Sequence, residues 1–180
     1  MEYKDYKNAG FAIRFLANLE EVFLSGILYF GLLYIFTLGI SQDNLAEKAV
    51  SIATFVLVFL FLSIPICALY YTLTTNKFGG NLGKLIFNLR VVDENSGQHL
   101  SKNTAFYRYV LGYIFSMKFF GLGFIQIIRK EDKRAWHDDL FQTKVIKIKD
   151  SWVGYPVFIL SASLMALFIY LIIANILQIS

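Results

Sequence analysis

The sequence predicts an all-α membrane protein with three transmembrane helices, a re-entrant or interfacial helix pair and a small cytoplasmic β-ladder. Three observations support this fold class. The 180-residue chain is 57% hydrophobic and 17% aromatic, with a mean hydropathy of +0.55, which is outside the usual range of a soluble globule. It contains three uncharged stretches of membrane-spanning length. Its basic residues are unequally distributed among the segments between these stretches.

The three expected spans follow from the length that a bilayer requires. About 30 Å of hydrocarbon needs roughly 20 helical residues at ~1.5 Å per residue. Residues 22–40 carry no charge and form the first span. Residues 49–75 form the second, where Pro65 favours a kink because it lacks an N–H and its ring meets the preceding turn. Residues 151–180 form the third, which has Trp152 near its start at the position of an interfacial aromatic.

Residues 106–128 are also long enough to cross, but Arg108 lies near one end and Lys118 in the middle. If this segment crosses, eight basic residues lie on each side of the membrane. If it enters and leaves on one side, fifteen lie on that side and one on the other. Because short cytoplasmic loops are enriched in Lys and Arg, we expect the second arrangement, with the chain breaking at Gly121 to Gly123. An ordinary fourth span, with Lys118 snorkelling or facing the bundle, remains the alternative.

This arrangement places the N-terminus in the cytoplasm and the C-terminus outside, in the plasma membrane (the cell inner membrane of a bacterium). Residues 89–101 contain the β-branched pair Val91 and Val92 and then a polar turn, and residues 143–149 alternate strictly. Both read as short strands. On one side of the membrane they can pair across the segment between them.

The sequence offers little for catalysis. No Ser/His/Asp order, paired catalytic carboxylates or cofactor loop emerges, so we expect neither an enzyme nor a cofactor. Cys67 is the only cysteine and lies in an apolar span, which excludes a disulfide. The GGNLGK stretch fails as a phosphate loop because Leu85 follows Lys84 in place of Ser or Thr. Nucleic-acid binding is disfavoured because the basic residues flank spans that already account for them.

Three residues are expected at the lipid headgroups or the membrane interface. Lys84 would face headgroups, Trp136 would anchor its loop, and His137 would be a surface or interface residue with a pKa suited to a pH response. His137 and Asp138 alone do not make a metal site, since zinc needs three or four ligands. The inner-face excess of basic residues predicts attraction to anionic lipids.

Four motifs occur in order along the chain: GFAIRFLANLEE, GGNLGKLIFNLRVVDENSG, RYVLG and HDDLFQTKVI. In order and spacing they resemble the RDD family of small membrane proteins, which is named for an arginine and two aspartates. The resemblance covers about residues 9–148. It divides the chain into an RDD-like membrane domain at residues 1–150 and an additional C-terminal transmembrane helix at residues 151–180.

The resemblance places the family arginine on Arg14, the first acidic position on Glu21 and the second on Asp138, with Asp93 as an open alternative. Helical spacing supports an Arg14–Glu21 pair independently, because seven residues at ~100° bring the two side chains to within ~20° of each other. Arg108, in the RYVLG motif, completes the expected charge network. Arg14 can be a positive-inside anchor, a structural ion-pair partner or part of a transport site. Asp138 can cap local structure or bind an ion.

Two function classes remain. Some RDD relatives have been linked to sodium/proton exchange, which implies a small-cation or proton transporter that uses buried arginine and carboxylates. The alternative is a non-catalytic membrane adapter or assembly module that binds a partner membrane protein or an anionic lipid. Three spans are few for alternating access, so transport would favour a homo-oligomer.

Overall fold

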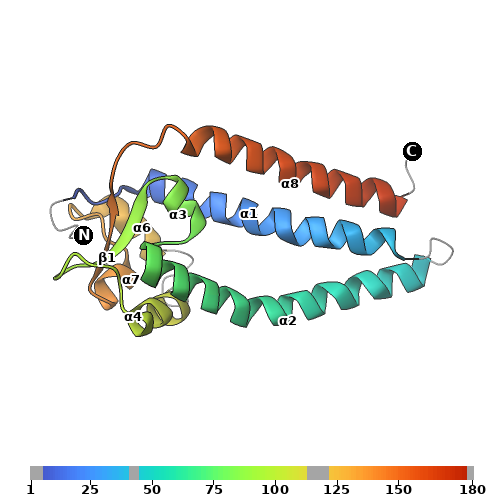
Figure 1. The fold of residues 1–180 in the computed structure, drawn as a ribbon, viewed down its shortest axis with the longest axis horizontal. Helices are drawn as coiled ribbons and strands as arrows, with labels where there is room; N and C mark the ends of the chain where they lie inside the picture. The colour runs from blue at the N-terminus through green and yellow to red at the C-terminus, as the bar shows by residue number, and fades with distance from the viewer. Residues whose placement is uncertain (1–5, 41–44, 113–121, 178–180) are drawn as a thin grey trace.

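The computed structural model describes residues 6–40, 45–112 and 122–177. Three long helices run alongside one another, with α1 (Phe11–Leu38) between α2 (Leu45–Phe78) and α8 (Gly154–Leu177), and a layer of short elements covers one end of them (Figure 1). All three helices are long and apolar enough to cross a membrane, as the sequence predicts. The described chain begins at the layer and finishes at the far end of α8, as an odd number of crossings requires.

Two of the long helices extend beyond the predicted spans. Helix α1 begins at Phe11, after Gly10 in an extended conformation, and continues through 28 residues without a break. Residues 11–21 and the predicted first span therefore form one helix, whose polar first turns lie within the layer. Helix α2 has 34 residues with Pro65 inside it, and it bends along its length in Figure 1.

Packing between the long helices combines small residues with aromatic rings. Helix α8 approaches α1 closely at Gly26, where an added Cβ would lie 2.6 Å from the sulfur of Met165. Helix α2 meets α1 through ring pairs, including Tyr29 with Phe59 at 4.7 Å between centroids. No residue in the most apolar stretch of α2 is buried. The sides of these helices are therefore left for lipid.

Among the described residues, the layer contains seven short elements. They are α3 (Leu82–Ile86), β1 (Leu89–Asp93), α4 (Lys102–Tyr107), the π-helical turn η1 (Arg108–Gly112), α6 (Leu122–Arg129), α7 (Trp136–Leu140) and β2 (Thr143–Lys147). Residues 106–128 are predicted to enter and leave on one side of the membrane. The described residues at both ends of this segment lie in the layer, at the same end of the long helices (Figure 1). Lys118 and Gly121, on which the prediction of a break depends, lie outside the described residues.

The two predicted strands pair antiparallel, which confirms the small β-ladder. Val91 lies opposite Val145, and Asp93 lies opposite Thr143. Val145 and Ile146 are both buried, so the ladder is covered on its two faces. The hydrophobic core of the protein gathers around it, with Phe87 and Leu89 fully enclosed. Most of the buried hydrophobic residues lie in the layer, where the short elements cover one another and the start of α1.

The short helix α3 is fixed against the backbone of α1. A Cβ added at Gly83 would lie 2.1 Å from the carbonyl oxygen of Ala17, so only glycine permits this approach. Asn81 begins α3, and its side-chain oxygen accepts a hydrogen bond from the backbone N–H of Lys84 at 3.3 Å. This contact brings Lys84 beside the first turns of α1.

Candidate functional site

Asp138 is the centre of a buried charge network. It lies in the first turn of α7, where its Oδ2 accepts the backbone N–H of Ala135 at 3.1 Å. Its side chain is fully buried, although neighbouring residues of the loop are exposed. The carboxylate therefore serves as a local cap and also carries a charge that must be balanced inside the protein.

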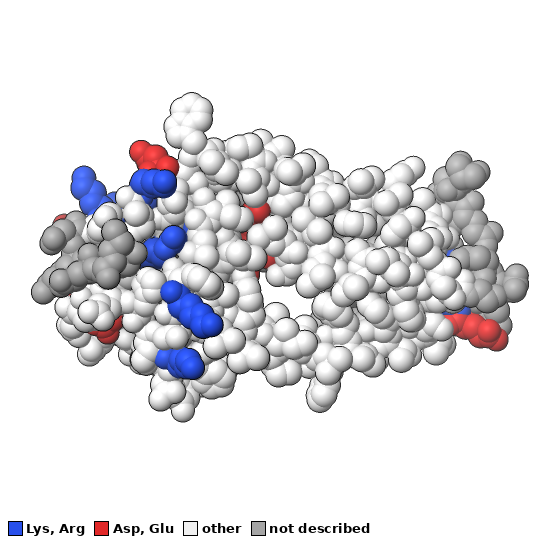
Figure 2. Space-filling model, viewed as in Figure 1, with Lys and Arg blue, Asp and Glu red and all other residues white. Residues whose placement is uncertain are grey.

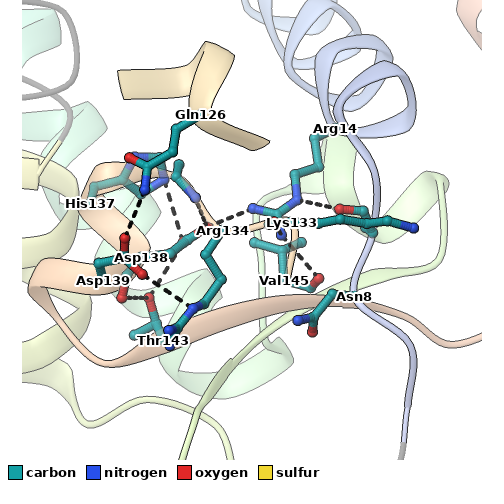
Figure 3. A network of polar contacts seen from close by, with 12 residues as sticks. Asn8, Arg14, Gln126, Lys133, Arg134, His137, Asp138, Asp139, Thr143 and Val145 are labelled. Carbon is teal, nitrogen blue, oxygen red and sulfur yellow. Dashed lines mark hydrogen bonds and ion pairs between the residues drawn. The ribbon is translucent and has the colours of Figure 1, made fainter. Parts of the chain in front are cut away.

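Arg14 reaches this carboxylate from α1 (Figure 3). One of its terminal nitrogens donates to Asp138 Oδ2 at 2.6 Å, and the other donates to the carbonyls of Lys133 at 2.7 Å and Val145 at 3.3 Å. Its Nε donates to the carbonyl of Ala9 at 2.9 Å. A single guanidinium thus joins α1, the loop before α7 and strand β2.

Arg108 reaches the other oxygen of Asp138 from η1, at 2.5 Å. Its Nε donates to the hydroxyl of Thr143, the first residue of β2, at 3.0 Å. Burial alone would raise the pKa of Asp138, but the imidazole of His137 and the guanidiniums of Arg108 and Arg14 outweigh it and hold that pKa well below its ordinary value. The structure therefore brings Arg14, Asp138 and Arg108 into one network and places Asp138 between two cations.

His137 differs from the surface or interface residue that the sequence predicts. Its side chain is buried against the ring of Phe124, with 5.3 Å between ring centroids. Burial, reinforced by Arg108, Arg14 and Lys84, lowers the pKa of His137 to about 3, against the raising effect of Asp138. The imidazole is therefore neutral near pH 7 and is not suited to the expected pH response.

A second, partly exposed set of charges lies outside this network. Arg134 contacts Asp132 at 2.7 Å, Asp139 at 3.1 Å and also Glu94, while Lys130 contacts Asp139 at 2.5 Å. These pairs hold the loop before α7 against the turn after β1. Except for Glu94, these residues are close in the sequence KEDKRAWHDD, whose mixture of basic and acidic residues is the signal for local pairing.

The network borders a cavity of about 460 Å³ between α1 and the layer. Positions 11, 14, 15, 18, 21 and 22 of α1 all line it, because helical spacing places them on one face. The opposite walls come from η1, α6, α7 and the segment around α3. The lining residues are Phe11, Arg14, Phe15, Asn18, Glu21, Val22, Tyr71, Asn81, Lys84, Arg108, Phe124, Ile125, Ile127, His137 and Val145.

Lys84 lies inside this cavity, in contrast to the headgroup-facing position expected from the sequence. It is 6% exposed. Its ammonium donates to the side-chain oxygens of Asn18 at 3.1 Å and Asn81 at 3.2 Å. Within the described part of the chain, no carboxylate lies within ion-pair distance of it. Gly83, which holds α3 close to α1, is the reason this lysine turns inward.

Glu21 also lines the cavity, but the structure does not pair it with Arg14. Its carboxylate accepts the backbone N–H of Gly83 at 2.7 Å, whereas Arg14 turns to Asp138. The two side chains share a helix face as predicted, yet tertiary contacts give them different partners. Glu21 fastens α3 to α1, and Arg14 fastens α1 to α7 and β2.

Two further predicted residues lie outside the network. The carboxylate of Asp93 accepts the backbone N–H groups of Ser96 at 2.8 Å and Asn95 at 3.1 Å, and the first of these bonds contributes most to lowering its pKa. Asp93 therefore shapes the turn after β1. Trp136 begins α7 and is half-buried.

Glu20 is a buried carboxylate that the sequence reasoning did not select. Its side chain is fully buried, and its Oε2 accepts the hydroxyl of Ser161 in α8 at 2.8 Å. Its Oε1 has no hydrogen-bond partner among the described residues. In the same part of the chain, no group of three or more His, Cys, Asp or Glu side chains could hold a metal ion.

The network predicts strong coupling between Arg14 and Asp138 and little between Arg14 and Glu21. Asp138→Asn should destabilise the protein by about 3–5 kcal/mol, because it leaves buried guanidiniums without their counter-ion. Arg14→Met combined with Asp138→Asn should cost at least ~0.5 kcal/mol less than the sum of the single changes. The measurement is the free energy of unfolding of the purified protein. The matched cycle of Arg14→Met with Glu21→Gln should be close to additive, and strict additivity in the first cycle would show that the network is not a unit.

The comparisons with known proteins agree with the resemblance seen in the sequence. Residues 8–142 match the RDD family, a range that includes Arg14, Arg108 and Asp138 but ends before α8. The chain is 35% identical over 150 residues to the uncharacterized protein YxaI of Bacillus subtilis (strain 168), a match that covers 78% of this chain and 97% of that protein. No solved structure matches the chain. The chain therefore belongs to the RDD family of membrane proteins.

Proposed function

We propose that the protein is a non-catalytic membrane adapter whose layer binds the anionic lipid headgroups of one leaflet. The observation that supports this proposal is a set of exposed cations on the layer that form no ion pair among the described residues. Figure 2 shows basic side chains gathered at this end, whereas the sides of the long helices are almost free of charge. The six residues are Lys7, Lys77, Lys102, Arg129, Lys133 and Lys149.

The buried network supports an adapter because it makes the layer rigid. Asp138 is bonded on both oxygens, so it has little capacity left for an incoming cation. Such a cation would also be repelled by Arg14 and Arg108. The same contacts join α1, η1, α7 and β2, so they hold the backbone next to Lys133 and Lys149 in one arrangement. A stable basic surface of this kind attracts anionic headgroups by ~1 kcal/mol for each well-placed Lys or Arg.

The lipid proposal predicts that phosphatidylglycerol stabilises the protein more than phosphatidylcholine does. In nanodiscs the melting temperature should be higher with phosphatidylglycerol, and the difference should shrink in 0.5 M NaCl, where surface charges are screened. The triple change Lys77→Gln, Lys102→Gln and Lys133→Gln should remove about 3 kcal/mol of this preference. The same three residues changed to Arg should keep it. Equal melting temperatures in the two lipids would contradict the proposal.

The orientation belongs to the same proposal: the basic layer lies at the cytoplasmic face and the end of α8 lies outside. With Cys67 changed to Ser, single cysteines are placed at Glu131 and Ser180 and intact cells are treated with an impermeant thiol reagent. We expect Ser180→Cys to be labelled and Glu131→Cys to be protected until the cells are permeabilised. Labelling of Glu131→Cys in intact cells would reverse the orientation and place the lysines against the wrong leaflet.

Cation or proton exchange is a second candidate, and Glu20 is the observation that favours it. A carboxylate buried between α1 and α8, with one oxygen lacking a partner in the described chain, is of the kind that carries protons or ions in membrane proteins. Arg14 and Arg108 do not contribute to this site, since both are bonded to Asp138. Exchange would therefore proceed at Glu20 and not at the charge network.

Liposome flux separates the two candidates. The protein is reconstituted with a trapped pH dye, and a sodium or proton gradient is imposed. The adapter predicts fluxes equal to those of empty liposomes. Flux that Glu20→Gln abolishes in a folded variant, while Lys77→Gln leaves it unchanged, would establish exchange and contradict the adapter.

A further inference from the structure

Lys84 is a buried cation that faces a cavity, and no carboxylate of the described residues lies within ion-pair distance of it. We infer that the cavity between α1 and the layer binds the acid group of one acidic membrane lipid at Lys84, with an alkyl chain of that lipid along α1. The ligand class follows from the proposed function, but the site is separate from the exposed lysines. It is a single internal position, whereas the proposed function concerns a surface.

The charges around the cavity favour the binding of one anion. Arg14, Lys84 and Arg108 are positive, while Glu21 and the adjoining Asp138 are negative. His137 is neutral near pH 7 because its pKa lies at about 3. Among the described residues that border the cavity, one positive charge is therefore left without compensation, and buried charges are normally paired. A group with a single negative charge balances the site.

Lys84 has the donor that such a group requires. An ammonium carries three N–H donors, and two of them are used by the side-chain oxygens of Asn18 and Asn81. Both acceptors are neutral amides, so they orient the ammonium without cancelling its charge. Its third donor has no partner among the described residues.

The remaining walls are suited to an alkyl chain. Phe11, Phe15 and Val22 line the cavity from α1, and three apolar residues of α6 face them: Phe124, Ile125 and Ile127. Phe15 and Val22 are also 50% and 59% exposed, so the cavity opens along α1. Val22 is the first residue of the uncharged part of α1. A chain leaving the cavity beside it therefore enters the hydrocarbon while the acid group stays at headgroup depth.

The size of the cavity limits what it holds. Its ~460 Å³ lies in the range of about 300–1,000 Å³ typical of small-ligand pockets. This accommodates an acid group and the first part of one chain. A small water-soluble anion would leave the aromatic walls unfilled, and a zwitterionic headgroup would bring its own cation next to Lys84. Both are therefore expected to bind much more weakly.

The test counts lipids bound to delipidated protein by native mass spectrometry in 0.5 M salt, which screens the surface lysines. The probes are phosphatidylglycerol, oleate, phosphatidylcholine and inorganic phosphate. We expect one phosphatidylglycerol or oleate to bind at least tenfold more tightly than phosphatidylcholine, with phosphate competing weakly. Equal binding of phosphatidylcholine, or phosphate competing as well as the lipids, would overturn the inference.

Two changes at the site make the test specific. Asn18→Asp keeps the shape of the side chain and places a carboxylate beside the Lys84 ammonium. It should raise the melting temperature without lipid and weaken acidic-lipid binding at least tenfold. Lys84→Gln retains an amide donor but no charge and should weaken binding similarly, whereas Lys84→Arg should preserve it.

The matched control is Lys144→Gln, an identical change at a partly exposed lysine that belongs neither to the cavity lining nor to the six surface cations, which should leave this binding unchanged. Unaltered acidic-lipid binding in Asn18→Asp would overturn the inference. If the surface proposal alone fails, the salt-sensitive lipid preference is absent but one lipid still binds in 0.5 M salt. If the cavity alone fails, the surface preference remains and the Asn18 and Lys84 variants behave like the wild type.

Discussion

The bonding of Asp138 by Arg14 and Arg108 is the interaction on which the layer depends. The three residues lie on α7, α1 and η1, and each is almost completely buried. Burying any one of them without the others would be costly, so the folded layer requires all three residues together. The carbonyls of Lys133 and Val145 accept further hydrogen bonds from Arg14. The bond to Val145 holds β2 against the start of α1. The layer is thereby held together by contacts within the protein.

This closed network also explains the electrostatics next to it. Because two guanidiniums share one carboxylate, the network retains a positive charge on the side where the cavity lies. The close approach of Gly83 to Ala17 then carries Lys84 into the same space and fixes Glu21 to the backbone of α3. The result is a polar end rich in donors joined to apolar walls. An anion is favoured there and a cation is disfavoured, which is why the geometry supports lipid binding more directly than cation exchange.

The two halves of the molecule are stabilised in different ways. The core lies around β1 and β2 in the layer, where Phe87, Leu89 and Ile146 are withdrawn from water. The long helices gain little from burial against one another, since lipid is as apolar as their side chains, and they meet at Gly26 and at ring pairs. Glu20 is one exception, because it lies buried between α1 and α8 with Ser161 as its hydrogen-bond donor.

The sequence by itself determined the elements that depend on local composition. Uncharged runs of about 20 residues predict the three long helices, and alternation with β-branched residues predicts the strands. The uneven distribution of lysine and arginine predicts that residues 106–128 return to the side of the membrane from which they enter. Motif order also identified Arg14 and Asp138. Only the tertiary structure decided their partners: helical periodicity puts Arg14 and Glu21 on one face, but it carries no information about a carboxylate 124 residues away. The inward position of Lys84 and the burial of His137 could not be predicted from the sequence either, because each depends on the packing of elements distant in the chain.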